Sequence, residues 1–220
     1  MKINRSILAI ASLATLMSGS AVSAHSLIKA TAVVETITLN DKVNKNQMIW
    51  ISEAPLENIK GATDGVTGTF TFDPSDVSKI RGTISTPTKT MKTGNATRDN
   101  HLVSAEWLDA NHYPDITFAI TSVESVKTVG SVSTATATGN FTMHGVTKRI
   151  SVPFKLTYVP ESDKTRQRAP GDLVMINADF TISLKDFKVA GQEGTVGSKV
   201  GEVIKINAQL FGNATKKSST

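Results

Sequence analysis

The sequence has 220 residues, a formal net charge of +5 and no cysteine. Without cysteine, disulfides, thiolate nucleophiles and thiolate metal sites are all excluded. Aromatic residues make up only 5% of the chain and the basic residues are scattered along it. A nucleic-acid-binding surface instead clusters lysine and arginine and interleaves them with aromatic side chains, so the composition predicts no nucleic-acid partner.

The first 24 residues have the pattern of a bacterial export signal. Lys2 and Arg5 precede an uncharged, mostly apolar run over residues 7–17, which is shorter than the roughly 20 residues that span a bilayer. Small residues follow at Val22-Ser23-Ala24, as a signal peptidase requires. We expect cleavage after Ala24, with a cut after Ala21 as the alternative.

The remaining residues, 25–220, are expected to form one domain in the periplasm. Removing residues 1–24 takes away two basic and no acidic side chains, which lowers the formal charge from +5 to +3. These 196 residues are enough to bury a core of their own. A lipid anchor needs a cysteine, so the sequence predicts no stable membrane anchor.

The first part of this domain alternates weakly between apolar and polar residues, which is typical of strands. Asn44-Lys45-Asn46 and Asp73-Pro74-Ser75-Asp76 have the composition of turns between them. The strands are predicted over residues 27–40, 47–53, 65–72 and 79–90.

A single helix is expected near residues 97–109. Asp99 lies in its first turn, where a negative charge opposes the helix dipole, and Leu102, Trp107 and Leu108 follow on one side. One short helix cannot cover a sheet, so the apolar faces of the strands must pack against one another.

Alternation is strongest in the second half. From Val146 the even positions to Tyr158 are mainly apolar and the odd ones mainly polar. This run would extend about 40 Å at about 3.3 Å per residue, which favours a tall barrel over a sandwich. Further strands are predicted over 116–121, 133–143, 174–185 and 204–210, so the fold class is an all-β, antiparallel, up-and-down barrel.

A barrel of about eight strands has an interior that side chains only just fill, or that holds one small ligand. Several inward positions carry small residues, among them Ala119, Ala178 and Ala208. The pattern therefore indicates an incompletely filled apolar interior, while a dry, packed core is an equal alternative.

The candidate catalytic and metal-binding groups lack the context that their chemistry needs. His101 and His112 are not spaced i, i+4 and no HExxH pattern accompanies them. Ser104 lies outside any G-x-S-x-G elbow, and the glycines over 191–201 are not followed by GK[ST]. We predict no catalytic residue, no metal and no cofactor.

The segment from Thr93 to Lys148 carries the most specific signal. It reads TGNATRDNHLVSAEWLDANHYPDITF and, further on, GNFTMHGVTK. These residues resemble the TGN, RD-x-HL, YP-x-I-x-F and HGVTK elements of the YceI-like family, with Phe141-Thr142 where Leu-Thr is usual. Residues 57–61 and 68–73 look like the family's earlier strands, so the resemblance covers nearly the whole mature chain.

The resemblance implies a lipocalin-like, extended eight-stranded barrel that encloses a long isoprenoid chain, such as a polyisoprenoid or a prenylated quinone. Members are often periplasmic and dimers occur, so a homodimer is compatible with it. Arg98 or Lys148 is then a candidate contact for a ligand head group. The expected ligand-binding residues are Phe70, Leu102, Trp107, Leu108, Phe118, Phe141, Phe154, Tyr158 and Phe180.

The sequence departs from the family over residues 50–57, where many members have a histidine-bearing start. Head-group contacts in that region are therefore expected to differ. The predicted function is storage, shielding or transport of an apolar ligand without catalysis. Two alternatives are an enzyme that acts on isoprenoid lipids, using groups over 98–115, and a filled structural or stress-related barrel.

Overall fold

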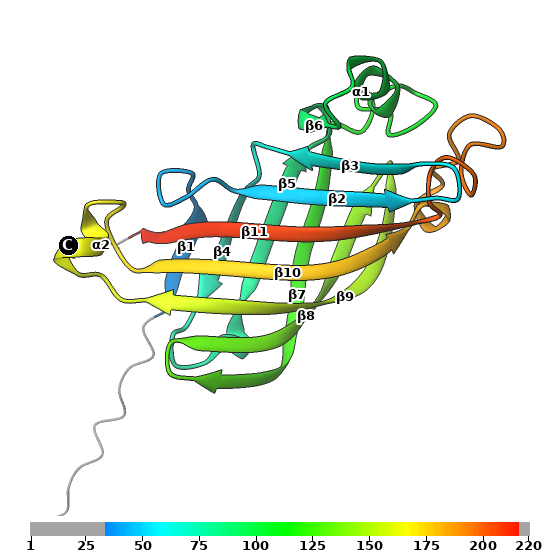
Figure 1. Ribbon diagram of the computed structural model, residues 1–220. Coiled ribbons are helices and arrows are strands. Elements are labelled where there is room, and N and C mark those ends of the chain that lie inside the picture. The colour runs from blue at the N-terminus through cyan, green and yellow to red at the C-terminus, as the bar shows by residue number, and fades with distance from the viewer. Residues whose placement is uncertain (1–33, 216–220) are drawn as a thin grey trace, which may run out of the picture. The chain divides into compact units, whose positions relative to one another are not determined.

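The computed structural model describes residues 34–215 (Figure 1). The predicted export signal over 1–24 and the beginning of the strand expected over 27–40 lie outside them. Within the described residues, no helix has the length and apolar character needed to cross a membrane.

The described chain is dominated by strands, with two short α-helices and three 3₁₀ turns. The α-helices are α1 (Ala96–Leu102) and α2 (Asp163–Arg166), and the 3₁₀ turns are η1 (Val77–Lys79), η2 (Thr88–Thr90) and η3 (Leu184–Phe187). The strands are β1 (Glu35–Leu39), β2 (Gln47–Glu53), β3 (Asn58–Thr63), β4 (Thr67–Phe72), β5 (Arg81–Pro87), β6 (Met91–Lys92), β7 (Asp115–Val129), β8 (Val132–Met143), β9 (Val146–Val159), β10 (Leu173–Ser183) and β11 (Val203–Thr215).

The sheet closes on itself. Its order is β1-β4-β5-β7-β8-β9-β10-β11, and β11 pairs back with β1, all antiparallel. β11 also pairs with β2 along residues 204–209, so β1 and β2 run in line beside it with the turn at 40–46 between them. The predicted eight-stranded, up-and-down barrel is confirmed.

The next two strands of the barrel are also each made of two shorter strands. β3 pairs with β2 and with β6, while β4 pairs with β1 and with β5. β3 and β4 therefore act as one barrel strand, and β5 and β6 as the next, with η2 between them. At this end β3 and β6 lie near α1 (Figure 1).

The long hairpin between β8 and β9 has continuous pairing from Val132↔Thr157 to Met143↔Val146. His144 and Gly145 join the strands with φ angles of 50° and 72°. Two consecutive positive φ values belong to the tight turn that matches the twist of a hairpin. The predicted turn at these residues is confirmed.

The helix is shorter than predicted. Asn95 caps its start by accepting from the Arg98 backbone N–H at 3.1 Å, and it ends at Leu102 instead of near 109. Ser104 Oγ donates to the His101 carbonyl at 2.7 Å and the chain continues as turns, because such side chains compete with helical hydrogen bonds. The expectation of a single helix was also wrong, since α2 follows a Ser162 capping box.

Alternation alone did not predict β3. Its sequence NIKGAT carries Gly61, which is unfavourable in a strand. The structure gives the reason for this glycine: a Cβ added there would lie 2.1 Å from Cζ2 of Trp50. The indole ring of Trp50 on β2 occupies the space that a side chain at position 61 would need.

The barrel interior divides into two halves. The packed cluster is well filled and includes Ile37, Phe70, Phe72, Leu156 and Val174, all at most 2% exposed. Ala178 and Ala208 pair across β10 and β11 within this same cluster, so these small residues do not line the open space. The cavity cluster occupies the other half and consists of Trp50, Ile59, Leu108, Phe141, Met143, Ile182, Leu184, Phe187, Val189 and Ile204.

Candidate ligand-binding site: an apolar cavity in one half of the barrel

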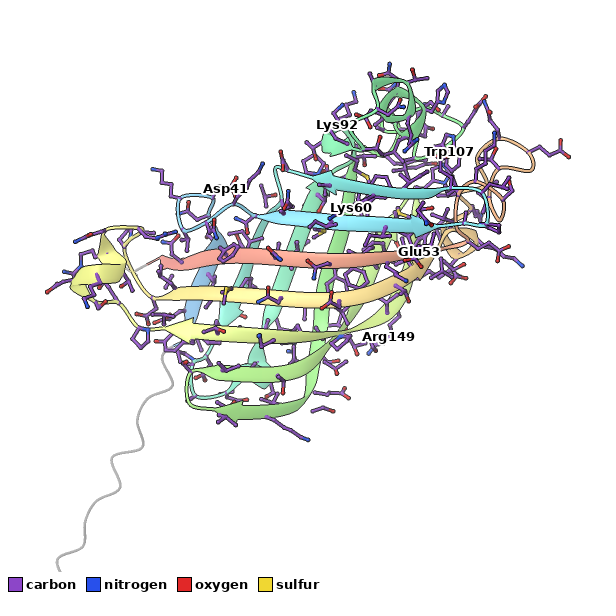
Figure 2. The ribbon with its side chains drawn as sticks, viewed as in Figure 1. Asp41, Glu53, Lys60, Lys92, Trp107 and Arg149 are labelled. Carbon is purple, nitrogen blue, oxygen red and sulfur yellow. The ribbon has the colours of Figure 1, made fainter. Side chains whose placement is uncertain are left out.

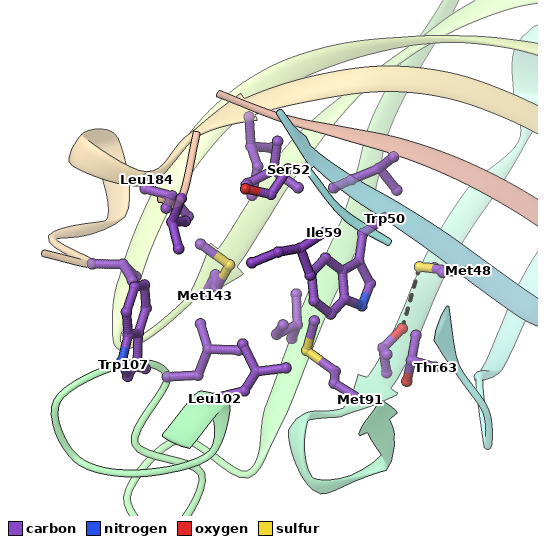
Figure 3. Close-up of a pocket in the computed structure, with 18 of the residues that line it drawn as sticks. Met48, Trp50, Ser52, Ile59, Thr63, Met91, Leu102, Trp107, Met143 and Leu184 are labelled. Carbon is purple, nitrogen blue, oxygen red and sulfur yellow. Dashed lines mark hydrogen bonds between the residues drawn. The ribbon is translucent and has the colours of Figure 1, made fainter. Parts of the chain in front are cut away.

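The cavity cluster surrounds an open space of about 400 Å³. Its walls come from β2, β3, β5 to β8, β10 and β11, and α1 and the loop over 189–200 stand at its mouth. Most of the lining side chains are aliphatic, aromatic or methionine (Figure 3). The sequence left an incompletely filled apolar interior and a dry, packed core as equal alternatives. The structure contains both, one in each half of the barrel.

Strand alternation places the lining residues. On β10, Phe180 and Ile182 point inward and pair with Ile206 and Ile204 on β11, while Thr181 between them is exposed. Inward positions nearer the start of β10, such as Ile176, belong instead to the packed cluster. Period-two alternation thus supplies both the cavity wall and the packed half.

The segment after α1 covers the mouth. The Leu108 N–H donates to the Leu102 carbonyl at 3.2 Å, so the turn brings both leucines to the cavity with Trp107 between α1 and the loop that follows η3 (Figure 2). A Cβ added to Gly191 would lie 2.5 Å from Cη2 of Trp107. The loop over 189–200 therefore packs its backbone directly onto this indole ring.

The rim of the mouth carries the cavity's charged groups. Arg98 Nη2 lies 2.6 Å from Glu57 Oε1, which joins α1 to the start of β3. His101 and Lys199 also border the opening. Lys148, the other candidate contact for a head group, is exposed on β9 and is not among the cavity-lining residues described.

Asp99 has a structural role next to this rim. Its Oδ1 accepts from the backbone N–H and the hydroxyl of Thr93, at 2.6 and 2.7 Å, and these hydrogen bonds lower its pKa. Asp115 is exposed and accepts from Ser85 at 3.2 Å. Neither carboxylate lines the cavity, so the acids and the histidine over 98–115 do not converge on one point there.

The structure brings together six of the nine residues predicted to bind ligand. Phe70, Phe154 and Tyr158 lie in or against the packed cluster, and of the described residues these three do not line the cavity. The ring of Tyr158 packs against Phe72 in a tilted arrangement, at a centroid distance of 5.4 Å, and its hydroxyl donates to Asp172. The six that line the cavity are Leu102, Trp107, Leu108, Phe118, Phe141 and Phe180.

Sequence reasoning missed much of the lining. Ile182 and Ile204 lie in strands that were predicted correctly, and their inward direction was readable from alternation. Met48 and Trp50 belong to β2, in and next to the stretch that departs from the family pattern. Their position depends on the pairing of β2 with β3 and β11, which no local pattern reveals.

Fold and site together define a closed antiparallel barrel with an apolar cavity in one half. The profile of the YceI-like domain matches residues 22–211, and the chain belongs to the YceI-like family. A UPF0312 protein of Pseudomonas putida is 33% identical over 145 residues, which cover 66% of this chain and 71% of the relative. Protein YceI of Salmonella arizonae is 32% identical over 139 residues, covering 63% and 68%.

Solved structures share the fold. BcnA of Burkholderia cenocepacia superposes with a TM-score of 0.63 at 18% identity, covering 79% of this chain and 98% of that one. A polyisoprenoid-binding domain from Saccharophagus degradans, implicated in plant cell wall breakdown, superposes with a TM-score of 0.62 at 12% identity, covering 81% and 98%.

Proposed function

We propose that this protein binds a long apolar molecule, such as a polyisoprenoid or a prenylated quinone, and stores, shields or transports it in the periplasm. The observation that carries the proposal is the open apolar cavity of about 400 Å³ inside a closed barrel. Ligand sites are typically concave, mostly apolar and roughly 300–1,000 Å³ in volume. The polyisoprenoid-binding domain with the same fold supports this class of ligand.

The size of the cavity limits how much of such a chain is enclosed. An apolar cavity of about 150 Å³ takes up one benzene molecule, so by proportion a cavity of 400 Å³ holds an apolar group of about 15 carbon atoms. A longer chain has to leave through the mouth, past Leu102 and Trp107.

The distribution of polar groups supports binding over catalysis. Hydrolytic enzymes place an acid and a base within hydrogen-bond reach of one reacting atom. Here Asp99 is held by Thr93, Asp115 by Ser85, and Arg98 by Glu57. These three groups each have a structural partner, so the alternative of an isoprenoid-processing enzyme has less support.

The proposed location rests on the export signal expected over residues 1–24. A prenyl chain is nearly insoluble in water, so moving one across an aqueous compartment requires a carrier that covers it. A barrel with its apolar space inside and charged side chains such as Glu53, Lys60 and Arg149 outside (Figure 2) meets that need.

Native mass spectrometry and organic extraction test the proposal. Protein produced with residues 1–24 is expected to carry a co-purifying lipid, and protein stripped by extraction is expected to take up an offered prenyl alcohol in a one-to-one ratio. A folded protein that is purified empty and takes up no prenyl chain contradicts the proposal.

A further inference from the structure

The indole N–H of Trp50 has no hydrogen-bond partner. Trp50 is 8% exposed, its Nε1 is buried, and no acceptor in the described part of the protein receives its proton. The indole is a donor only, and a buried donor without an acceptor is unusual in a folded protein. Trp50 also lines the cavity, so the residue that carries this buried N–H forms part of the wall around the space that a ligand would fill.

The neighbouring backbone fixes the orientation of the ring. A Cβ added to Gly61 would lie 2.1 Å from Cζ2 and 2.3 Å from Cε2 of Trp50. The ring therefore lies directly against β3 at Gly61, the residue that pairs with Trp50. Because the ring is wedged in place, the N–H cannot turn toward a protein acceptor without breaking this contact.

A second donor lies close by with only a weak acceptor. Thr86 is 4% exposed and its hydroxyl donates to Sδ of Met48 at 3.5 Å, and a thioether sulfur is a poor acceptor. Met48 precedes Trp50 by two residues on the same face of β2, and all three line the cavity. In Figure 3 the nitrogen edge of Trp50 faces the side where Met48 and Thr63 lie.

The charges of the cavity lie elsewhere. Among the described lining residues the fixed charges are Glu57, Arg98 and Lys199. Glu57 is four residues from Gly61, about 13 Å along an extended chain, and Arg98 is paired with it. Lys199 follows Ser198, whose carbonyl accepts from the Leu56 N–H beyond the end of β2. An anion beside Trp50 would be desolvated without a cation to balance it, which is strongly unfavourable.

We propose that the ligand carries a neutral oxygen acceptor, a carbonyl or hydroxyl oxygen, that receives hydrogen bonds from Trp50 Nε1–H and Thr86 Oγ1–H inside the cavity. This inference rests on the proposed function and narrows its ligand class. The bound molecule is then an oxygen-bearing apolar chain whose uncharged polar atom sits next to β2. A plain hydrocarbon or a chain with a charged group at this position is disfavoured.

Matched ligands test the inference. Pentadecane and the methyl ketone of the same chain length are offered to lipid-free protein, and affinity is measured by competition against a fluorescent apolar probe. The ketone is expected to bind about 2- to 10-fold more tightly, the range of one hydrogen bond. In protein with ¹⁵N-labelled indole groups, the ketone moves the Trp50 N–H resonance downfield and pentadecane does not.

Trp50→Phe keeps an aromatic ring but removes one of the two donors, so it is expected to reduce the preference for the ketone. Tyr113→Phe, which removes a hydroxyl donor from a ring that does not line the cavity, preserves the preference. Equal affinities with an unmoved Trp50 resonance overturn the inference and leave the proposed function intact. A hydrogen bond from this N–H to water that persists when the ketone is bound also overturns the inference and leaves the proposed function intact.

Two further outcomes are decisive. If neither chain binds to folded protein, the proposed function fails together with this inference. If Trp50→Phe does not fold, the response of the wild-type Trp50 resonance to the two ligands decides the question by itself.

Discussion

Trp107 packs its indole ring against the backbone of Gly191, which joins the segment after α1 to the loop over 189–200 across the cavity mouth. The φ angle of Gly191 is 61°, and a Cβ there would lie 2.5 Å from the ring. Gln192 Nε2 adds a hydrogen bond to Glu106 Oε2 at 3.1 Å. Two segments distant in sequence thus meet over the opening.

Gly191→Ala is expected to open this contact. The new methyl group meets the ring and the backbone is held at an unfavourable positive φ, so bound apolar probe should dissociate faster, as measured by stopped-flow release. Gly194→Ala is the control, because Gly194 also has a positive φ of 73° but nothing within 4 Å of its Cβ position. Equal acceleration in both variants would argue against a closing role for the Trp107 contact.

The two halves of the barrel should respond differently to the same substitution on β10. Ile182→Phe adds volume next to the cavity and is expected to lower ligand uptake with little effect on stability. Ile176→Phe overpacks the filled half and is expected to lower the free energy of unfolding by about 1–3 kcal/mol while uptake is retained.

Urea unfolding and ligand titration of both variants test this pair. If Ile176→Phe abolished uptake in a folded protein and Ile182→Phe did not, the ligand site would have to lie in the packed half. Phe70, Phe154 and Tyr158 would then be its lining.

Because of Glu35, the free energy of unfolding is expected to be lower at high pH than at low pH. Burial, followed by the charge of Asp172 and a hydrogen bond to it, raises the pKa of Glu35 to about 7. Because the folded pKa lies above the unfolded value, the carboxyl group stabilises the fold when protonated, and this contribution is lost as pH rises through about 7. Wild-type protein should therefore unfold at a lower urea concentration at about pH 9 than at about pH 5.

Glu35→Gln is expected to flatten this dependence, since the amide stays neutral at every pH. Glu193→Gln, which changes an exposed loop carboxylate, should leave the wild-type profile in place. A wild-type profile that is flat between these pH values would show that Glu35 does not titrate there.

Asp73 is expected to act in the opposite direction. Its carboxylate is buried and accepts from Ser75 N–H at 2.9 Å, Ser75 Oγ at 2.5 Å and Lys79 Nζ at 2.9 Å, and these bonds hold its pKa at about 2. Its stabilisation is present above the unfolded pKa and is lost as pH falls toward 2.

Asp73→Asn should lower the free energy of unfolding at neutral pH by about 1–3 kcal/mol, because the amide replaces a buried acceptor of charge-assisted bonds. Asp64→Asn is the matched control, since the Asp64–Lys45 pair is more than half exposed on both sides and such pairs contribute little. Equal losses in both variants would contradict this role of the buried turn.

Local patterns determined the strands and several turns of this protein. Alternation from Val146 to Tyr158 predicted β9, His144-Gly145 predicted the turn before it, and Asp73-Pro74 predicted the turn after β4. Each depends on the period of a strand or on the φ angles that a few residues adopt, which neighbours in sequence decide. The block over 93–148 predicted the family in the same way, from residues close together in the chain.

Only the tertiary structure decided where the interior is open. Phe70 and Phe180 are both inward-facing phenylalanines, yet one is packed and the other borders the cavity. Alternation fixes which face of a strand a residue occupies, but free volume depends on side chains contributed by eight strands at the same height. The contact of Trp50 with Gly61, and the unpartnered N–H that results from it, likewise arise only when β2 pairs with β3.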